Sequence, residues 1–232
     1  MKYWSQVLQL VTVAIVAIGI GCAPPAGAPE AAQPAMEESA EAEAMPATGP
    51  KMDTFDQSDG SLFAVEAPHK IEGRMLHLQA GQEDTVLLSS VESAAMKEYT
   101  VTAEVMPPNV GESVGIAFAV RGKSSQILFY VYRPAGADPF GKKCSVGVEG
   151  HIGGRSMRAP DIRTREVTFQ KDTPIKLSAR QVGQNVTLSI NGENIGRFHE
   201  RSLRPGKVGM YGKSQHGDSS PATVKFDSFG VE

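Results

Sequence analysis

From Leu62 to the end of the chain, apolar and polar residues alternate with a period of two, and helical three-to-four-residue spacing is absent over any useful length. This alternation is typical of strands that bury one face. The segments are short and are separated by Gly, Pro, Asn, Asp and Ser, as in antiparallel strands joined by turns. Strands are predicted at 62–66, 74–79, 84–90, 98–106, 113–121, 126–133, 142–149, 165–170, 174–181, 185–190, 195–198, 207–212 and 223–229.

The clearest turn in this pattern is Asn191-Gly192, which separates two of the predicted strands. Both residue types tolerate the positive φ angles of a type I′ turn, so the pair predicts a hairpin. Many short antiparallel strands and no internal repeat favour a β-sandwich or jelly roll over a propeller or solenoid. The predicted fold class is therefore all-β, an antiparallel β-sandwich.

The chain begins with a different pattern. Lys2 precedes an apolar run, Val7–Gly21, of about 15 residues, which is shorter than the roughly 20 residues that a membrane-spanning helix needs. A cleaved secretion signal over residues 1–21 is therefore favoured. The sequence Gly19-Ile20-Gly21-Cys22 resembles a bacterial lipobox, which implies that Cys22 is acylated. Gly19 stands where Leu is usual, so an uncleaved anchor helix stays an alternative.

Residues 22–50 have the composition of a linker. After Cys22 they are mostly Ala, Pro, Glu, Gly and Met, with five glutamates and no basic residue, and they offer too little apolar surface to form a core. The folded domain is expected over 51–232. Both versions of the N-terminus hold this domain at a membrane outside the cytoplasm, so a cell-envelope location, in the periplasm or on the cell surface, is expected.

Composition excludes several classes of protein. The chain is 41% hydrophobic and 21% charged with a net charge of −3, which excludes a wholly disordered protein and gives no electrostatic footprint for nucleic acid. Of 23 basic and 26 acidic residues, Lys2 and the five linker glutamates lie outside the domain, which leaves 22 basic and 21 acidic residues within it. Two cysteines are too few for a disulfide scaffold.

The order of the strands resembles a known superfamily. Gly115-Ile116-Ala117-Phe118, Phe129-Tyr130-Val131-Tyr132, Leu188-Ser189-Ile190-Asn191-Gly192, Val208-Gly209-Met210-Tyr211 and Val224-Lys225-Phe226-Asp227 are similar to strands of concanavalin A-like lectin/glucanase domains, notably the laminin G-like and 3-keto-disaccharide hydrolase-like branches. The resemblance covers about residues 60–232. It implies a jelly roll whose saccharide site lies on the concave face of one sheet.

Strand parity predicts which side chains could line such a face. The core rows are Val114, Ile116, Phe118 and Val120; Phe129 and Val131; Cys144, Val146 and Val148; and Tyr99, Val101, Ala103 and Val105. Their alternates must point to the opposite face. That face is expected to bind a glycan through Arg121, Tyr130, Tyr132, Glu104, Glu149, Thr102 and Ser145. The alternative is an ordinary solvent-facing surface.

Catalysis would need two carboxyl groups at glycosidase spacing. The glucanases of the superfamily carry two Glu and one Asp at alternating positions on one strand, and this cluster is missing from the sequence. Glu104 and Glu149, on different predicted strands, are the pair that could still meet.

Three further sites are weaker. Arg155, Arg158, Arg163 and Arg165 lie in one predicted loop and could bind an anion, although solvated surface is the alternative. Asp227 and Asp218 are candidate calcium ligands, as in some relatives, while the five histidines show no metal-ligand spacing. Cys144 alternates with valines and is expected to be a buried small hydrophobe.

The sequence thus predicts a membrane-tethered, non-catalytic carbohydrate-binding lipoprotein. A glycoside hydrolase or related enzyme, and a protein-interaction or structural envelope lipoprotein, are the alternatives. The glycan, the membrane and the oligomeric state stay open.

Overall fold

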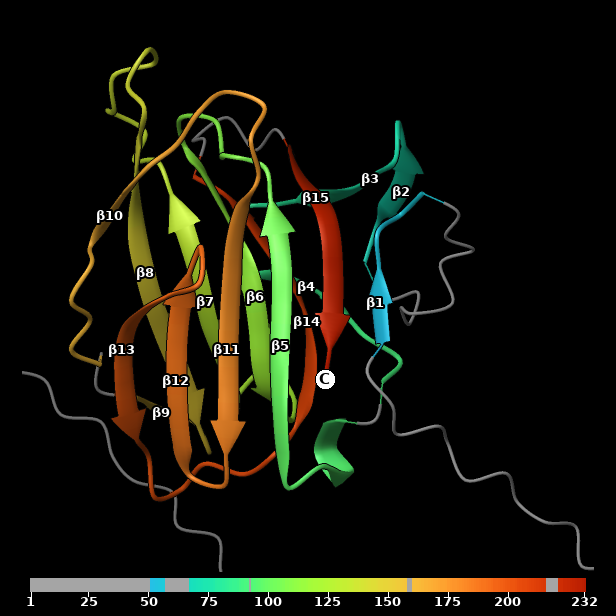
Figure 1. The fold of residues 1–232 in the computed structure, drawn as a ribbon, viewed down its shortest axis with the longest axis vertical. Helices are drawn as coiled ribbons and strands as arrows, with labels where there is room; N and C mark the ends of the chain where they lie inside the picture. Colours follow the sequence, from blue (N-terminus) through green and yellow to red (C-terminus); the bar gives the residue numbers. More distant parts are fainter. Residues whose placement is uncertain (1–50, 57–66, 92, 158–159, 216–220) are drawn as a thin grey trace, which may run out of the picture. The chain divides into compact units, whose positions relative to one another are not determined.

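A computed structural model describes residues 51–56, 67–91, 93–157, 160–215 and 221–232. Within these ranges the chain is a sandwich of two antiparallel β-sheets, as the alternation predicts (Figure 1). The single helical element described is a short 3₁₀ turn, η1 (Ser93–Ala95). No helix in the described part is long and apolar enough to cross a membrane. The signal (1–21), Cys22 and the linker (22–50) lie outside the described residues.

We call the two layers sheet 1 and sheet 2. Sheet 1 has the spatial order β13 (Glu193–His199), β12 (Asn185–Ile190), β11 (Ile175–Val182), β5 (Glu98–Val105), β15 (Ala222–Val231), β3 (Met75–Ala80) and β2 (His69–Glu72), with β1 (Lys51–Asp53) paired to β15. Sheet 2 has the order β10 (Glu166–Thr168), β8 (Lys143–Ile152), β7 (Gln126–Tyr132), β6 (Glu112–Val120), β14 (Lys207–Ser214) and β4 (Thr85–Leu88), with β9 (Arg155–Ser156) paired to β8.

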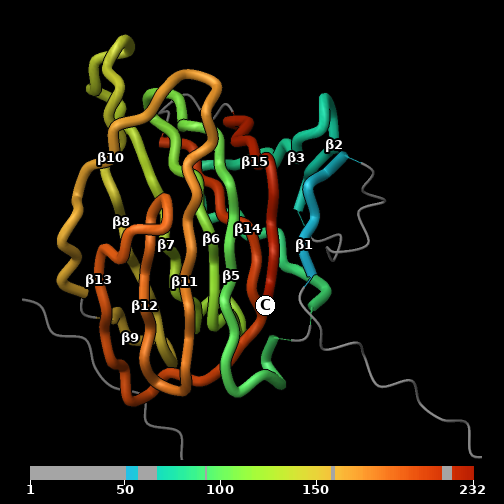
Figure 2. Tube along the Cα trace, in the orientation of Figure 1, coloured from blue at the N-terminus to red at the C-terminus, as the bar shows by residue number. Residues whose placement is uncertain are grey.

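Sequence-distant strands are neighbours in both layers. The C-terminal strand β15 lies between β5 and β3, and β14 lies between β6 and β4 (Figure 2). Such crossings between strands far apart in the chain are the jelly-roll connectivity that separates this fold from a simple meander. The β12–β13 hairpin turns at Asn191 and Gly192, whose φ angles of 51° and 82° confirm the predicted type of turn.

The core lies between the sheets. Val101, Ala103 and Val105 of β5 are buried there, whereas Thr100 and Thr102 between them are partly exposed on the outer face of sheet 1. From sheet 2, the rows of Ile116 and Phe129 face the same core, as predicted. Alternation therefore decides which side chains are buried because each strand presents one apolar face to the other layer.

One predicted core residue points the other way. Phe118 and Ala119 together oppose Val208, which is a β-bulge, and Ala119 has a φ of 52°. The extra residue reverses the parity of the rest of β6. Ala119 therefore joins the core, and Val120, predicted to be in it, packs on the outer face of sheet 2.

Candidate functional site

The outer face of sheet 2 carries a second apolar cluster, separate from the core. Its buried members are Ala117, Val120, Leu128, Tyr130 and Tyr211, with Val86, Leu88 and Tyr132 packed against them. The outer face of a sandwich is ordinarily polar, so an apolar cluster there indicates a surface adapted for something other than solvent. We call this cluster, with the polar side chains bonded to its hydroxyl groups, the tyrosine face.

The strand register explains how large rings fit on this face. One row across the sheet reads Gly147, Tyr130, Gly115, Tyr211 and Val86, so that each tyrosine lies beside a glycine. The ring centroids of Tyr130 and Tyr211 are 5.3 Å apart, and their planes are tilted by 50°. Such tilted contact is favourable for aromatic pairs, and the glycines make room for it.

Tyr130 also contacts the ring of Tyr132, which lies next on the same side of β7. Their centroids are 5.8 Å apart. Tyr132 pairs across the strands with Ser145, so this predicted site residue lies at the border of the cluster. Three rings therefore form one continuous aromatic group across β7 and β14.

Carboxylates hold the two inner hydroxyl groups in place. The hydroxyl of Tyr130 donates a hydrogen bond to Glu149, and that of Tyr211 donates to Asp84 at 3.2 Å. Lys213 Nζ also donates to Asp84, at 3.0 Å. Burial raises the pKa of both tyrosines well above its ordinary value, and the neighbouring carboxylates raise it further, so both hydroxyls stay protonated donors.

The two inner rings are less accessible than the parity argument implied. Tyr130 is 7% exposed and Tyr211 is 1% exposed, while Tyr132 is partly exposed. Tyr130 therefore offers no open platform for a sugar ring, contrary to the expectation from sequence. Its ring instead belongs to the buried part of the apolar cluster, against which the more accessible Tyr132 packs.

An open groove borders the tyrosine face. It has a volume of about 1130 Å³ and is bounded by β4, the β6–β7 turn and β14. Val86, Leu88 and Val120 belong both to this groove and to the apolar cluster, which makes the two features continuous. The groove is also lined by polar side chains from these elements, namely Gln82, Glu83, Asp84, Thr85, Arg121, Lys123, Gln126, Lys207 and Lys213.

Arg121 lines the groove, but strand parity is not the reason for its position. The bulge ends the regular alternation of β6, and Arg121 lies in the following turn, where its backbone N–H donates to Ser125 at 2.8 Å. Its side chain is exposed on the groove wall. The structure thus places Tyr130, Tyr132, Glu149 and Ser145 on sheet 2, and Arg121 in the β6–β7 turn, at the opposite end of these strands from Tyr132 and Ser145.

Two residues predicted for this face lie elsewhere. Thr102 and Glu104 belong to β5 in sheet 1 and point to the outer side of that sheet, away from the core. The whole sandwich separates them from Glu149. The expected groove containing them is therefore wrong, and so is the expected Glu104–Glu149 carboxylate pair.

The arginine loop does not form a compact cluster. Arg155 pairs with Ile152 at one end of β8, whereas the carbonyl of Arg165 accepts a bond from Val146 at 2.9 Å. Six residues of strand separate these points, about 20 Å at the usual rise. Arg163 bonds through its backbone to Ile195 of sheet 1, at 2.7 Å. Arg158 lies outside the described residues.

The metal candidates gain no support. Asp227 lies at an irregularity of β15, and Asp218 is outside the described residues. In the described ranges, no three His, Cys, Asp or Glu side chains form a cluster that could hold a metal ion. Cys144 is buried and free, as expected for a small hydrophobe.

Tyr211, Asp84 and Lys213 were not among the residues predicted for this face. A signal for Tyr211 was available, since Val208 and Met210 carry the apolar pattern of β14 and alternation places Tyr211 on the face opposite Met210. Asp84 and Lys213 could not be found in this way, because their contribution depends on β4 pairing with β14.

Comparison with known proteins gives the fold and no closer relationship. No family model and no curated protein matches this chain. Among solved structures, it is similar to a xylan β-1,4-xylosidase from Bacillus halodurans C-125, with a TM-score of 0.53 and 14% identity over 79% of this chain and 39% of the xylosidase. This chain therefore spans about two fifths of that enzyme's length.

Two smaller proteins are covered almost completely. A lichenase derived from a mouse hindgut metagenome matches with a TM-score of 0.52 and 9% identity, over 79% of this chain and 98% of the lichenase. The carbohydrate recognition domain of Emp46p, in its potassium-bound form, matches with a TM-score of 0.51 and 11% identity, over 77% of this chain and 94% of that domain. The chain thus has the jelly-roll fold of lectin- and glucanase-like domains.

Proposed function

We propose that this protein binds carbohydrate through the tyrosine face and the adjoining groove. The observation that carries the proposal is the apolar aromatic cluster on the outer face of sheet 2, continuous with a groove that has polar groups along its walls. Sites for small molecules combine an apolar lining with a few polar groups that fix orientation. Sugar rings, with apolar faces and hydroxyl edges, fit such a lining.

The shared fold supports the same conclusion. The similar structures include a carbohydrate recognition domain, a lichenase and a xylosidase, all named for carbohydrate substrates or ligands. Function does not follow from the fold alone, so the proposal rests on the site and uses the fold as support.

The carboxylates of the face favour binding over hydrolysis. Glu149 lies on β8 and Asp84 just before β4, and the carboxylate of each accepts a hydrogen bond from a tyrosine hydroxyl. Asp84 also accepts a bond from Lys213. Hydrolysis of a glycosidic bond needs one carboxyl group as acid and another as base or nucleophile, whereas both carboxylates here are engaged in fixing tyrosine hydroxyls.

The place of action is a further part of the proposal. The acylated Cys22 and the acidic linker would hold the domain at the cell envelope, where polysaccharides are accessible. The laminin G-like and 3-keto-disaccharide hydrolase-like resemblance agrees with this role, and envelope attachment is testable through the covalent state of Cys22.

A glycan array screened with the full-length chain, followed by calorimetry with the best neutral glycan, tests the proposal. Tyr132→Ala and Arg121→Gln should each weaken binding by roughly tenfold, because truncating an anchor residue in a site typically costs more than 1 kcal/mol. Glu149→Gln should weaken it less, since it acts through Tyr130.

Glu104→Gln is the matched control, because Glu104 has the same chemistry on the outer face of the other sheet. Affinity unchanged in all the site variants, or equally reduced by Glu104→Gln, would reject the tyrosine face as the binding site. Chromatography of the glycan after incubation separates binding from hydrolysis, because an enzyme would leave shorter products.

A further inference from the structure

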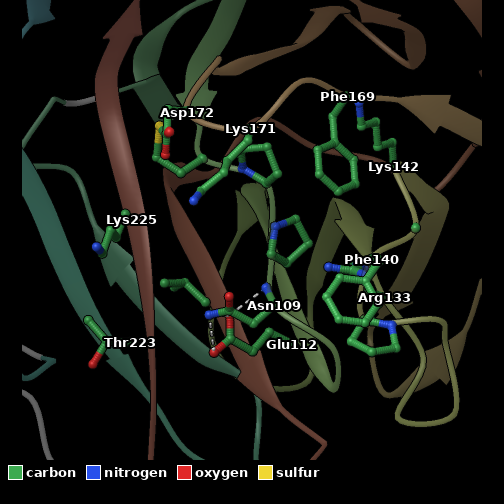
Figure 3. Close-up of a pocket in the computed structure, with 16 residues that line it drawn as sticks. Asn109, Glu112, Arg133, Phe140, Lys142, Phe169, Lys171, Asp172, Thr223 and Lys225 are labelled. Atoms are coloured by element: carbon green, nitrogen blue, oxygen red, sulfur yellow. Dashed lines mark hydrogen bonds between the residues drawn. The ribbon is translucent and has the colours of Figure 1, made fainter.

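A second pocket lies at the opposite end of the β6–β7 pair from the groove. The groove borders Val120 and Gln126, where β6 ends and β7 begins, whereas this pocket borders Glu112 and Arg133, where β6 begins and β7 ends. Its volume is about 500 Å³. Figure 3 shows Arg133, Phe140 and Phe169 on one side of it and Thr223 and Lys225 of β15 on the other.

Arg133 is an unusual residue for its position. It continues the core row of Phe129 and Val131, and it is 7% exposed. Its Nη2 donates to the carbonyl of Asp138, and its guanidinium carbon lies 5.6 Å from the centre of the Phe169 ring. Its buried Nε has no hydrogen-bond partner in the described structure.

The guanidinium also has no counter-ion in the described part of the chain. Among the described residues, no carboxylate lies within ion-pairing distance of Arg133. The nearby buried acid, Glu112, is engaged otherwise: its carboxylate accepts bonds from the backbone N–H of Asn109 at 2.9 Å and from the Asn109 amide at 3.0 and 3.1 Å. A buried charge without a counter-ion is costly, so an anion bound here would lower the free energy of the pocket.

The rest of the lining favours an anion too. Lys142, Lys171 and Lys225 border this pocket from three separate parts of the chain, and Asp172 is an acidic residue of the same lining (Figure 3). With Arg133 and Glu112 included, the residues that line the pocket comprise four basic and two acidic ones. The pocket is thus locally cationic in a domain whose overall charge is about neutral.

An exposed aromatic ring completes the lining. Phe140, in the segment between β7 and β8, is 90% exposed although it is a large hydrophobe. An aromatic ring left in solvent beside cationic side chains provides a flat apolar surface next to an anion-binding group. That combination matches a sugar ring that bears an oxyanion.

We propose that this pocket binds a carboxylate or sulfate group carried by a sugar, with Arg133 and the lysines bonding the oxyanion and Phe140 covering the ring. Guanidinium groups bind such oxyanions with strong, charge-assisted hydrogen bonds. The oxyanion site stands on the pocket alone, whereas naming a sugar as the carrier rests on the proposed function.

Calorimetric titration of the full-length chain tests this site with four probes: glucuronate, glucose 6-sulfate, glucose and sodium acetate. Glucuronate or glucose 6-sulfate should bind at least tenfold more tightly than glucose, with the affinity falling as salt rises. The stronger of the two identifies the oxyanion. Equal affinity for glucose and the two acidic sugars would overturn the site, and acetate binding as tightly as glucuronate would overturn the sugar as carrier.

Variants of the lining residues test whether the acidic sugar binds in this pocket. Arg133→Met keeps the apolar stem and removes the charge, and it should reduce affinity at least tenfold. Because this residue is buried, the exposed variants Phe140→Ala and Lys171→Gln provide a second test and should each reduce affinity severalfold. Lys176→Gln, an exposed lysine on β11, is the matched control and should have no effect. Unchanged affinity in Phe140→Ala and Lys171→Gln would overturn the proposal.

The proposals for the two sites can be rejected independently of each other. Tyr132→Ala and Glu149→Gln should leave acidic-sugar binding unchanged if the pocket is independent. Loss of neutral-glycan binding with retained, Arg133-dependent binding of glucuronate would overturn the proposed function of the tyrosine face and leave this site in place.

Discussion

The ring of Tyr130 occupies the space that a side chain at position 147 would fill. A Cβ added at Gly147 would lie 2.4 Å from Cζ of Tyr130 and 2.7 Å from its hydroxyl oxygen. Such distances are far below van der Waals contact, so the glycine on β8 is a condition for the position of the ring and for its hydrogen bond to Glu149.

Gly147→Ala should therefore displace the Tyr130 ring without disturbing the strands. We expect a loss of about 1 kcal/mol of unfolding free energy, roughly that of one hydrogen bond, measured by urea unfolding. Gly115→Ala should cost more, about 1–3 kcal/mol or above, because its Cβ would lie 2.2 Å from the backbone oxygen of Phe129 and 2.5 Å from the Cα of Tyr130.

A double-mutant cycle separates a clash with the Tyr130 ring from a clash with backbone atoms. In a Tyr130→Ala background, Gly147→Ala should become nearly neutral, since the clashing ring is gone, whereas Gly115→Ala should stay costly because backbone atoms remain. Equal costs of Gly147→Ala in both backgrounds would contradict this relationship.

Alternation along the chain predicted most of the sandwich because each strand must bury one face. It missed β1, β2 and β9, which are two to four residues long and too short to show a period. It also assumed uninterrupted strands, so the bulge at Ala119 reversed the parity of Val120. The strand predicted at 62–66 lies outside the described residues.

The sequence predicted only part of the candidate site, and the reason for the errors is related. Parity says which side chains share a face of one strand, but it does not say which strands share a sheet. β5 was grouped with β6, β7 and β8, and it pairs instead with β11 and β15, which removed Glu104 and Thr102 from the face. Arg133 was overlooked although its parity places it in the core row, where an unpaired charge is informative.

Phe55 should anchor the N-terminal edge of the domain. It follows β1, is 2% exposed and belongs to the main core. Phe55→Ala should lower the unfolding free energy by about 3–5 kcal/mol, as for other buried phenylalanines. Met52→Ala, at a residue 53% exposed on β1, is the control and should change it by about 0.5 kcal/mol or less. Similar values for both variants, from urea unfolding, would place Phe55 outside the core.

Counting reactive thiols tests the lipid anchor. Burial raises the pKa of the Cys144 thiol to about 12, so Cys144 should resist a thiol reagent at pH 8 in the native protein and react after unfolding. If Cys22 is acylated in a bacterial host, the unfolded chain should show one reactive thiol, and intact mass should show loss of residues 1–21 with added acyl chains. Two reactive thiols and a retained Met1 would reject the lipoprotein.

High pH should destabilise the fold through its buried tyrosines. Burial raises the pKa of Tyr99, Tyr130 and Tyr211 above the ordinary value near 10, so the native state keeps these protons when the unfolded state loses them. A raised native pKa gives stability that is complete below pH 10 and is lost as pH rises above it, by up to about 1.4 kcal/mol per pH unit for each tyrosine. Urea unfolding at pH 8 to 11.5 should show this decline, to which the buried Cys144 thiol also contributes, and Tyr130→Phe should reduce its slope by up to about one quarter. A slope that Tyr130→Phe leaves unchanged would mean that Tyr130 ionises as freely in the native protein as in the unfolded chain.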